Sequence, residues 1–400
     1  MLNLANILDY SAKEYAEKTA LVFGDKRFSY TQLNAVANQV ANGLTALGIG
    51  KGDKVALSCP NLPYFPMIYF GILKAGAVVV PLNVLLKGRE IAYHLKDSDA
   101  KAYFCFQGTP ELPMAAEGWA GFKDAQTCEH FWVVTADPAA PSPIDGAATF
   151  GQFLASQSPA FDSVTTDFDD TAVILYTSGT TGFPKGAELS HANMTLNALG
   201  SRELLQTTVD DVHLIVLPLF HSFGQTVLMN AGLSRGNTLV LIPRFTPEGV
   251  LGAMQAEKVT VFAGVPTMFQ MMTQAQNWDS ADLSSLRFCT SGGAPLPAPL
   301  FYPGLLPFNA GSFRMSPVHV ADVAAAFVRA LQNPQTIGQT LHLGGPESIS
   351  WKEILRRLAE AKGRSKLMLP APALGVSAAA ALLQRFEDFP ITRDQIRMLL

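Results

Sequence analysis

The sequence has 400 residues, of which 48% are hydrophobic and 16% are charged. This composition is typical of a globular protein with room for two or three domains, and it excludes a disordered chain. The formal net charge of −4, without a basic stripe, argues against nucleic-acid binding. The charge is uneven: residues 301–400 carry 11 basic and 7 acidic side chains, and the remainder carries 18 and 26, which fits two unlike parts.

Helices and strands alternate from residue 29 onward. Ser29 and Gln32 predict a capping box, which is followed by apolar residues at helical spacing as far as Leu47, with Gly48 as the stop. Residues 138–170 are rich in Pro, Ala, Ser and Asp, and we expect a surface excursion there. The predicted strands are 54–59, 77–81, 101–106, 172–176, 214–217, 238–242, 259–263 and 286–290. This alternation predicts an α/β fold of layered, mostly parallel sheets covered by helices.

The spacing of the cysteines and the length of the apolar runs indicate the cellular compartment of the protein. No Cys-x-x-Cys pair occurs, so neither a zinc site nor a disulfide framework is expected. We therefore expect reduced, buried thiols in a cytoplasmic protein. The start of the chain lacks the basic residues of a signal peptide. The apolar run 367–383 contains Pro370 and Pro372 and is shorter than the ~20 residues of a membrane span. Peripheral contact with a membrane is the alternative to a span. The four cysteines are Cys59, Cys105, Cys128 and Cys289.

The segment 176–186 reads Tyr-Thr-Ser-Gly-Thr-Thr-Gly-Phe-Pro-Lys-Gly and follows a predicted strand. Gly179 and Gly182 allow positive φ and a close approach to an anion. Hydroxyls and free backbone N–H groups can hold phosphate oxygens, and Lys185 adds a cation. The spacing does not match the P-loop of NTPases. From the residues alone, an ordinary Gly-rich loop with an exposed lysine is the alternative.

This loop resembles the signature of the adenylate-forming superfamily, which includes acyl-CoA synthetases, coumarate ligases, luciferases and peptide-synthetase adenylation domains. Three further segments agree in type and order: 188–193 (Glu-Leu-Ser-His-Ala-Asn), 217–224 (Leu-Pro-Leu-Phe-His-Ser-Phe-Gly) and 291–296 (Ser-Gly-Gly-Ala-Pro-Leu). Segment 264–268 (Gly-Val-Pro-Thr-Met) is similar to the acyl-pocket segment. Residues 1–298 thus resemble the N-terminal part of an AMP-forming acyl-CoA synthetase.

The resemblance implies a site for ATP, Mg²⁺, a small-molecule carboxylate and coenzyme A. The carboxylate would attack the α-phosphorus of ATP to give an acyl adenylate and pyrophosphate, and coenzyme A would displace AMP. The implied phosphate contacts are Thr177, Ser178, Gly179, Thr180, Thr181, Gly182 and Lys185, with Thr177 also facing Mg²⁺. The residues implied to border adenine and the acyl group are Gly292, Gly293, Ala294 and Pro295. The acyl site would be lined by His221, Val265, Pro266 and Met268. His221 and Lys185 would be catalytic, although His221 could instead be a buried structural histidine and the other three acyl-site residues ordinary core.

After Leu296 the pattern changes. The family's Tyr-Gly-x-Thr-Glu segment, its Thr-Gly-Asp segment and its C-terminal catalytic lysine are not found. Segments 315–327, 340–345 and 350–353 instead resemble the C-terminal lobe of extended short-chain dehydrogenases and epimerases, especially an atypical branch related to a respiratory complex I subunit. That family's Gly-rich fingerprint and Tyr-x-x-x-Lys pair are absent, so no NAD(P) chemistry is expected.

The sequence therefore predicts an apparent chimera in three parts. A truncated adenylate-forming domain would span 1–298, an irregular Pro- and Gly-rich linker 299–315, and a small αβ epimerase-like unit 316–400. The leading hypothesis is a fatty-acyl or related CoA ligase whose activity is impaired by the missing motifs. The alternatives are a non-catalytic ATP- or acyl-binding fragment, a non-functional chimera, and an epimerase-like or respiratory-accessory role of the tail. Acyl chain length and oligomeric state cannot be read from the sequence.

Overall fold

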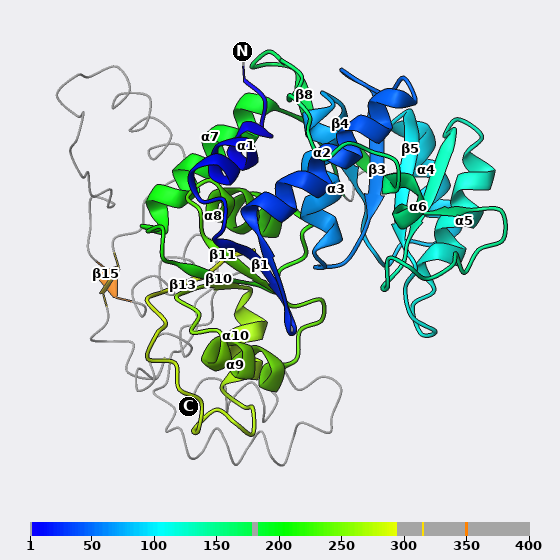
Figure 1. Cartoon of the computed structure of the whole chain (residues 1–400). Coiled ribbons are helices and arrows are strands. Elements are labelled where there is room, and N and C mark those ends of the chain that lie inside the picture. The colour runs from blue at the N-terminus through cyan, green and yellow to red at the C-terminus, as the bar shows by residue number, and fades with distance from the viewer. Residues whose placement is uncertain (1, 178–182, 294–313, 316–348, 351–400) are drawn as a thin grey trace, which may run out of the picture. The chain divides into compact units, whose positions relative to one another are not determined.

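A computed structural model describes residues 2–177, 183–293, 314–315 and 349–350. It divides the chain into two compact units, Met1–Ala294 and Pro295–Leu400. The first unit contains two sheets with helices packed on their faces (Figure 1). Most neighbouring strands are parallel, as the alternation of helices and strands predicts for an α/β fold.

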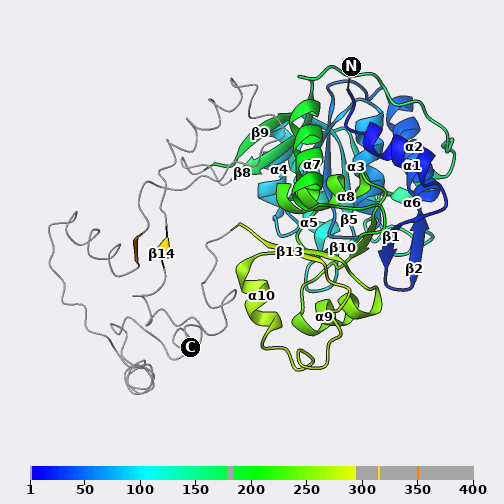
Figure 2. The ribbon, with the colours of Figure 1, turned by 90° about the vertical axis from the view of Figure 1, so that its left-hand side faces the viewer.

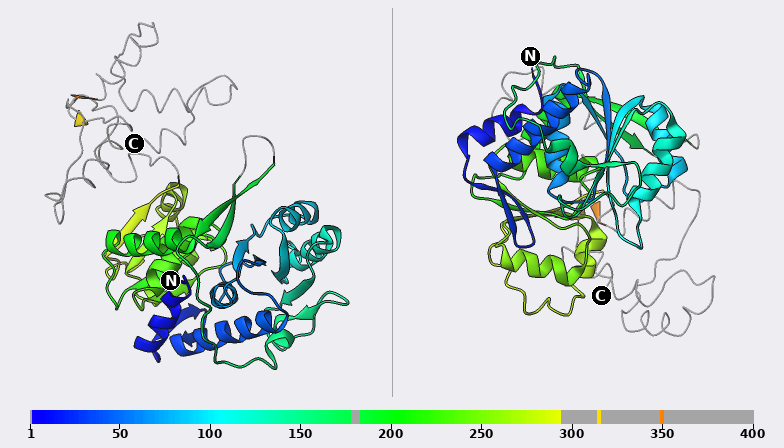
Figure 3. Two further views of the ribbon diagram at one scale, coloured as in Figure 1. Left: turned by 90° about the horizontal axis from the view of Figure 1, so that it is seen from above. Right: turned by 45° about the vertical axis from the view of Figure 1, so that its right-hand side comes forward.

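The larger sheet has seven strands among the described residues. In spatial order they are β7 (Ala148–Thr149), β6 (His130–Val134), β5 (Ala100–Phe106), β3 (Lys54–Ser58), β4 (Val78–Pro81), β8 (Thr171–Thr177) and β9 (Lys185–Ser190). Every residue of β4 is buried, which is typical of a parallel strand covered on both faces. One face carries α4 (Gly88–Asp97) and α5 (Met114–Ala125) (Figures 1 and 3). The other face carries α2 (Tyr30–Ala46), α3 (Tyr64–Lys74) and α6 (Phe150–Leu154).

The second sheet has six strands in the described part of the chain. Their order is β13 (Phe288–Ser291), β12 (Val261–Gly264), β10 (Val212–Ile215), β11 (Thr238–Leu241), β1 (Thr19–Phe23) and β2 (Lys26–Ser29). Helices α9 (Pro247–Ala256) and α10 (Pro266–Met272) lie below this sheet in Figures 1 and 2. Above it lie α1 (Asn6–Glu14), α7 (His191–Leu204), a π-helix η1 (Phe223–Asn230) and α8 (Ala231–Leu233).

The predicted strands all occur, with ends that differ from the prediction by at most two residues. The capping box is also confirmed, since the amide of Gln32 donates to Ser29 Oγ at 3.2 Å and the amide of Ser29 donates to Gln32 Oε1 at 2.9 Å. The surface excursion expected over 138–170 is wrong in part. It contains β7 and α6, because its aromatic residues pack on the sheet: the centroid of the Phe153 ring lies 4.5 Å from that of the Trp132 ring on β6.

Two predictions about single side chains need correction. Cys289 is exposed on the edge strand β13, whereas the other three cysteines are buried as expected. His221 is exposed, so the alternative of a buried structural histidine is wrong. Among the described residues, no helix combines the length and the apolar character needed to cross a bilayer.

In the second unit, β14 (Arg314–Met315) pairs antiparallel with β15 (Ile349–Ser350). Arg314 and Met315 fall within the predicted irregular linker 299–315 but form a short strand. The other elements predicted for the linker and for the epimerase-like unit lie outside the described residues.

Candidate functional site

The predicted phosphate loop joins two antiparallel strands. Thr177 at the end of β8 pairs with Lys185 at the start of β9, and both side chains are exposed. The Lys185 ammonium forms no ion pair with any residue that the structure describes. The loop leaves the carboxyl end of β8, which is the edge of an α/β sheet where ligands usually bind. The loop residues Ser178, Gly179, Thr180, Thr181 and Gly182 lie outside the described part of the chain.

Helix α4 holds both ends of this loop. At the entrance, the Tyr176 hydroxyl donates to Asp97 Oδ2 at 2.7 Å. Burial and the neighbouring Asp97 carboxylate raise the pKa of Tyr176, so its hydroxyl stays protonated and remains a donor. At the exit, the Tyr93 hydroxyl donates to the carbonyl of Pro184 at 2.9 Å, and the Phe183 ring lies 5.7 Å from the Tyr93 ring. The loop is therefore anchored at two points one helical turn apart.

The sequence did not predict these contacts between α4 and the loop. Tyr93 and Asp97 are four residues apart and so share one helix face, which is the only local signal. Their partners are about 80 to 90 residues away in the chain, and only the folded sheet brings them together.

Asn61 positions the segment that carries His221. Its Nδ2 donates to the carbonyls of Ile215, Leu217 and Ile242 at 3.2, 3.0 and 3.2 Å, and its Oδ1 accepts from the Leu219 amide at 3.0 Å. Asn61 is only 3% exposed, so it makes these hydrogen bonds away from bulk solvent. Asn61 follows β3 of the seven-stranded sheet, and its partners follow β10 and β11 of the other sheet. The contact therefore ties the carboxyl ends of the two sheets together.

His221 lies in the turn between this anchored segment and η1. Its Nδ1 accepts a hydrogen bond from the Phe223 amide at 3.2 Å, which fixes the ring beside the helix start. At Gly224 the chain passes so close to itself that an added Cβ would lie 2.5 Å from the carbonyl oxygen of Pro218. Glycine is required there, and π-helical turns such as η1 are frequent at functional sites.

The Ser-Gly-Gly motif lies beside this turn. The amide of Gly292 donates to the carbonyl of Gly264 at 3.2 Å, which extends the pairing of β13 with β12 by one residue. A Cβ on Gly292 would lie 2.9 Å from the Phe223 ring. Gly293 has φ +79°, and a Cβ there would lie 3.5 Å from Val265. Three separate sequence motifs therefore meet at the carboxyl ends of β10, β12 and β13.

The residues predicted to shape the acyl site begin α10. Val265 is half-buried at the N-cap, Pro266 is buried in the first turn, and Met268 is half-buried. Met268 packs against both apolar cores of the unit. Val265 is thus the member of this set that adjoins the Gly292–Gly293 turn. Ala294 and Pro295 lie outside the described residues.

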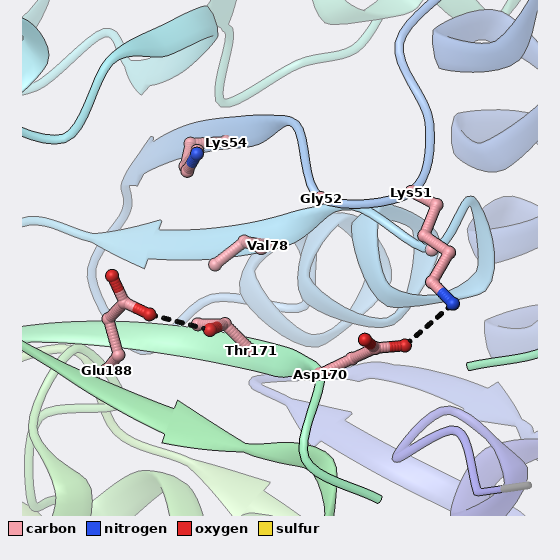
Figure 4. A pocket seen from close by; sticks show the side chains of 8 residues that line it. Lys51, Gly52, Lys54, Val78, Asp170, Thr171 and Glu188 are labelled. Carbon is pink, nitrogen blue, oxygen red and sulfur yellow. Dashed lines mark hydrogen bonds and ion pairs between the residues drawn. The ribbon is translucent and has the colours of Figure 1, made fainter. Parts of the chain in front are cut away.

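A hollow of about 440 Å³ occurs at the other end of β8 (Figure 4). It lies where β3, β4 and β8 begin, so it is remote from the phosphate loop. Its charges are partly compensated: the Lys51 ammonium lies 2.8 Å from Asp170 Oδ2, and the Thr171 hydroxyl donates to Glu188 Oε2 at 2.8 Å. We therefore do not include this hollow in the candidate site.

The described residues fit a magnesium nucleotide. Lys185 offers an exposed cation and Thr177 an exposed residue with a hydroxyl, opposite each other at the base of the loop. Within the described ranges, no group of three or more His, Cys, Asp and Glu could hold a metal alone. Mg²⁺ in phosphate sites usually takes few protein ligands, so Thr177 and the phosphate oxygens are the donors that it would use.

Comparison with known proteins agrees with this geometry. Residues 8–303 match the family described as AMP-binding enzyme. Feruloyl-CoA synthase from Amycolatopsis sp is 35% identical over 289 residues, which cover 70% of this chain and 52% of that protein. The N-terminal domain of FACL13 from Mycobacterium tuberculosis has a TM-score of 0.66 at 32% identity and covers 75% of this chain and 72% of that structure.

ATP-bound MatB from Rhodopseudomonas palustris has a TM-score of 0.64 at 30% identity and covers 75% of this chain and 56% of that structure. The chain spans about half the length of the curated relatives that it matches. The family match, the two-sheet fold and the convergence of the motifs lead to one conclusion: this chain belongs to the AMP-binding enzyme family, whose members include acyl-CoA ligases.

Proposed function

We propose that this chain binds ATP at the β8–β9 loop and activates a carboxylate as an acyl adenylate, which coenzyme A would then convert to a thioester. The observation that carries the proposal is the strand pairing of Thr177 with Lys185, which brings an exposed threonine and an exposed lysine together at the base of the loop. When bound, the magnesium nucleotide supplies an electrophilic α-phosphorus and pyrophosphate as a leaving group.

Each part of the site has a role in this proposal. Lys185 offsets the negative charge that develops on the phosphates, which is most effective when the cation is already in place. The glycines of the Gly292–Gly293 turn leave room for the nucleotide base. His221, exposed at the same edge, lies beside the reacting carboxylate, and Val265 contributes an apolar wall for the acyl group.

We also propose that adenylation by this chain is weak. The family's second Mg²⁺ contact, its ribose-binding Asp and its catalytic lysine have no counterparts in residues 297–400. A fragment that binds ATP or a carboxylate without turnover is therefore the second candidate function.

The test is exchange of labelled pyrophosphate into ATP with hexanoate, palmitate, ferulate or benzoate as the acid. We expect exchange with at least one acid, and its loss in Lys185→Ala. Lys26→Ala is the matched control, because Lys26 is another exposed strand lysine without an ion pair in the described region. If folded protein shows no exchange with any acid, the ligase proposal fails. Calorimetric binding of ATP without exchange would establish the non-catalytic alternative.

The epimerase-like or respiratory-accessory role of residues 305–400 stays a separate proposal. It rests on the sequence resemblance of that region alone. Titration with NAD(P)H, followed by its fluorescence, tests it, and an unchanged spectrum would count against it.

A further inference from the structure

A second hollow, of about 320 Å³, lies among α1, α7 and the turn that follows α8. These three helices lie side by side above the six-stranded sheet (Figures 1 and 2). The phosphate loop is anchored on α4 instead, so this hollow is separate from the candidate adenylation site. The lining residues that matter for its chemistry are Tyr10, Tyr15, Thr195, Leu199, Arg202 and Arg235.

The described lining of the hollow is positively charged. Arg202 and Arg235 line it, and none of the described residues that line it is an Asp or a Glu. Arg235 is exposed and forms no ion pair with a described residue. Arg202 contacts only its neighbour Glu203, at 3.3 Å, and the Glu203 side chain is 78% exposed. Such an exposed pair is weak, so Arg202 can turn to a ligand at little cost.

Thr195 supplies an independent sign of a missing partner. Thr195 lines the hollow and is 8% exposed. Its Oγ1 is buried and has no hydrogen-bond partner in the described part of the chain. Buried hydroxyls in folded proteins are nearly always paired, and an unpaired one is costly. A ligand oxygen in the hollow would accept this hydrogen bond.

The rest of the lining is partly apolar. It includes Leu199, Tyr10 and Tyr15, together with the smaller polar residues Asn3, Asn6 and Ser234, and Tyr10 is 57% exposed although it is aromatic. A hollow with apolar surface, a few polar groups and this volume is typical of a small-molecule site. Two guanidinium groups suit a planar carboxylate, which accepts paired hydrogen bonds.

We propose that this hollow binds a small organic carboxylate with a short apolar body, held by Arg202, Arg235 and the Thr195 hydroxyl. The apolar body packs against Leu199 and the two tyrosine rings. The site lies outside the adenylation machinery and its occupancy does not depend on ATP.

The test is a titration with hexanoate, followed by the ring signals of ¹³C-tyrosine-labelled protein, with Tyr10 and Tyr15 assigned from their Phe variants. We expect saturable shifts of these two rings. Arg235→Gln should weaken binding by about tenfold or more, because a charge-assisted hydrogen bond is lost. Arg89→Gln, an exposed arginine on α4, is the matched control and should bind as the parent does. Lys185→Ala should also leave these shifts unchanged, which separates this site from the adenylation site.

Two further probes define the ligand, one without a charge and one without an apolar body. Hexanamide should bind at least about tenfold more weakly, since it lacks the charge, and inorganic phosphate should bind more weakly because it lacks the apolar body. Thr195→Val should weaken hexanoate binding without lowering the melting temperature, since it removes only a buried hydroxyl without a partner. The proposal is overturned if the tyrosine shifts do not saturate, if Arg235→Gln binds as the parent does, or if either alternative probe matches hexanoate.

Discussion

Replacement of Asn61 by Ala should be among the most destabilising polar substitutions in the first unit. The change removes two N–H donors that serve three carbonyls, those of Ile215, Leu217 and Ile242. It also removes the acceptor of the Leu219 amide. All of these groups lie in or beside the core, and Asn61 itself is 3% exposed.

The magnitude follows from the number of groups left without partners. Each hydrogen bond contributes about 1 kcal/mol, and each buried group that loses its partner costs about 1 to 3 kcal/mol. Some of the carbonyls will find a water or shift slightly, so we expect a loss of about 3 to 5 kcal/mol. Asn42→Ala is the matched control. Its Nδ2 also donates to three carbonyls, but two of these bonds are exposed and water can replace them, so about 1 kcal/mol is expected.

Urea unfolding at equilibrium, followed by circular dichroism, measures both variants. Hydrogen exchange of the Leu219 amide gives the local readout, since this N–H loses its acceptor in the variant. If Asn61→Ala costs no more than Asn42→Ala, or if the Leu219 amide stays protected, the reasoning is wrong.

Three further predictions concern single residues. Burial lowers the pKa of His213 to about 4, below its ordinary 6.5, so the unfolded chain takes up the proton first as pH falls. Stability should therefore drop by about 3 kcal/mol between pH 6.5 and 4, and urea unfolding of His213→Leu should show a flatter dependence. Gly224→Ala places a Cβ against the Pro218 carbonyl and should cost about 1 to 3 kcal/mol in thermal unfolding, whereas Gly252→Ala on α9 meets open space and should be neutral or stabilising. Tyr93→Phe frees the end of the phosphate loop and should weaken ATP binding about two- to tenfold by calorimetry, with little change in melting temperature.

The strands could be predicted because their signal is local. Strands buried on both faces, such as β4, are short apolar runs that need no partner to be recognised. The edge strand β9 was missed, since Lys185–Ser190 is mostly exposed and polar and forms a strand only because β8 lies beside it. Helix α6 was missed although Thr149 and Gln152 form a capping box, because the surrounding composition favoured a loop.

In the candidate site, too, the short motifs could be predicted and the long-range contacts could not. Its glycines and hydroxyls stand in short motifs, so the β8–β9 loop and the Gly292–Gly293 turn were found from the sequence. The groups that hold these motifs were not found. Asn61 and its partners are separated by more than 150 residues, and Tyr93 is 91 residues from Pro184. No pattern in a single sequence encodes such pairs, because an asparagine after a strand is more often a turn residue than a core anchor.

The position of Asn61 has a consequence for activity that differs from its effect on stability. The phosphate loop belongs to the seven-stranded sheet, whereas His221 and Gly292 belong to the six-stranded sheet, and Asn61 ties the two edges together. In the proposed function, adenylation and contact with the nucleotide base need groups from both sheets, whereas contact with the phosphates needs only the loop and α4. In Asn61→Ala protein that remains folded at low temperature, pyrophosphate exchange should therefore fall about tenfold or more, while the affinity for magnesium tripolyphosphate changes by less than about threefold, since only relative placement is lost. An equal loss of exchange and of tripolyphosphate affinity would show that Asn61 supports the whole unit and does not align its two halves.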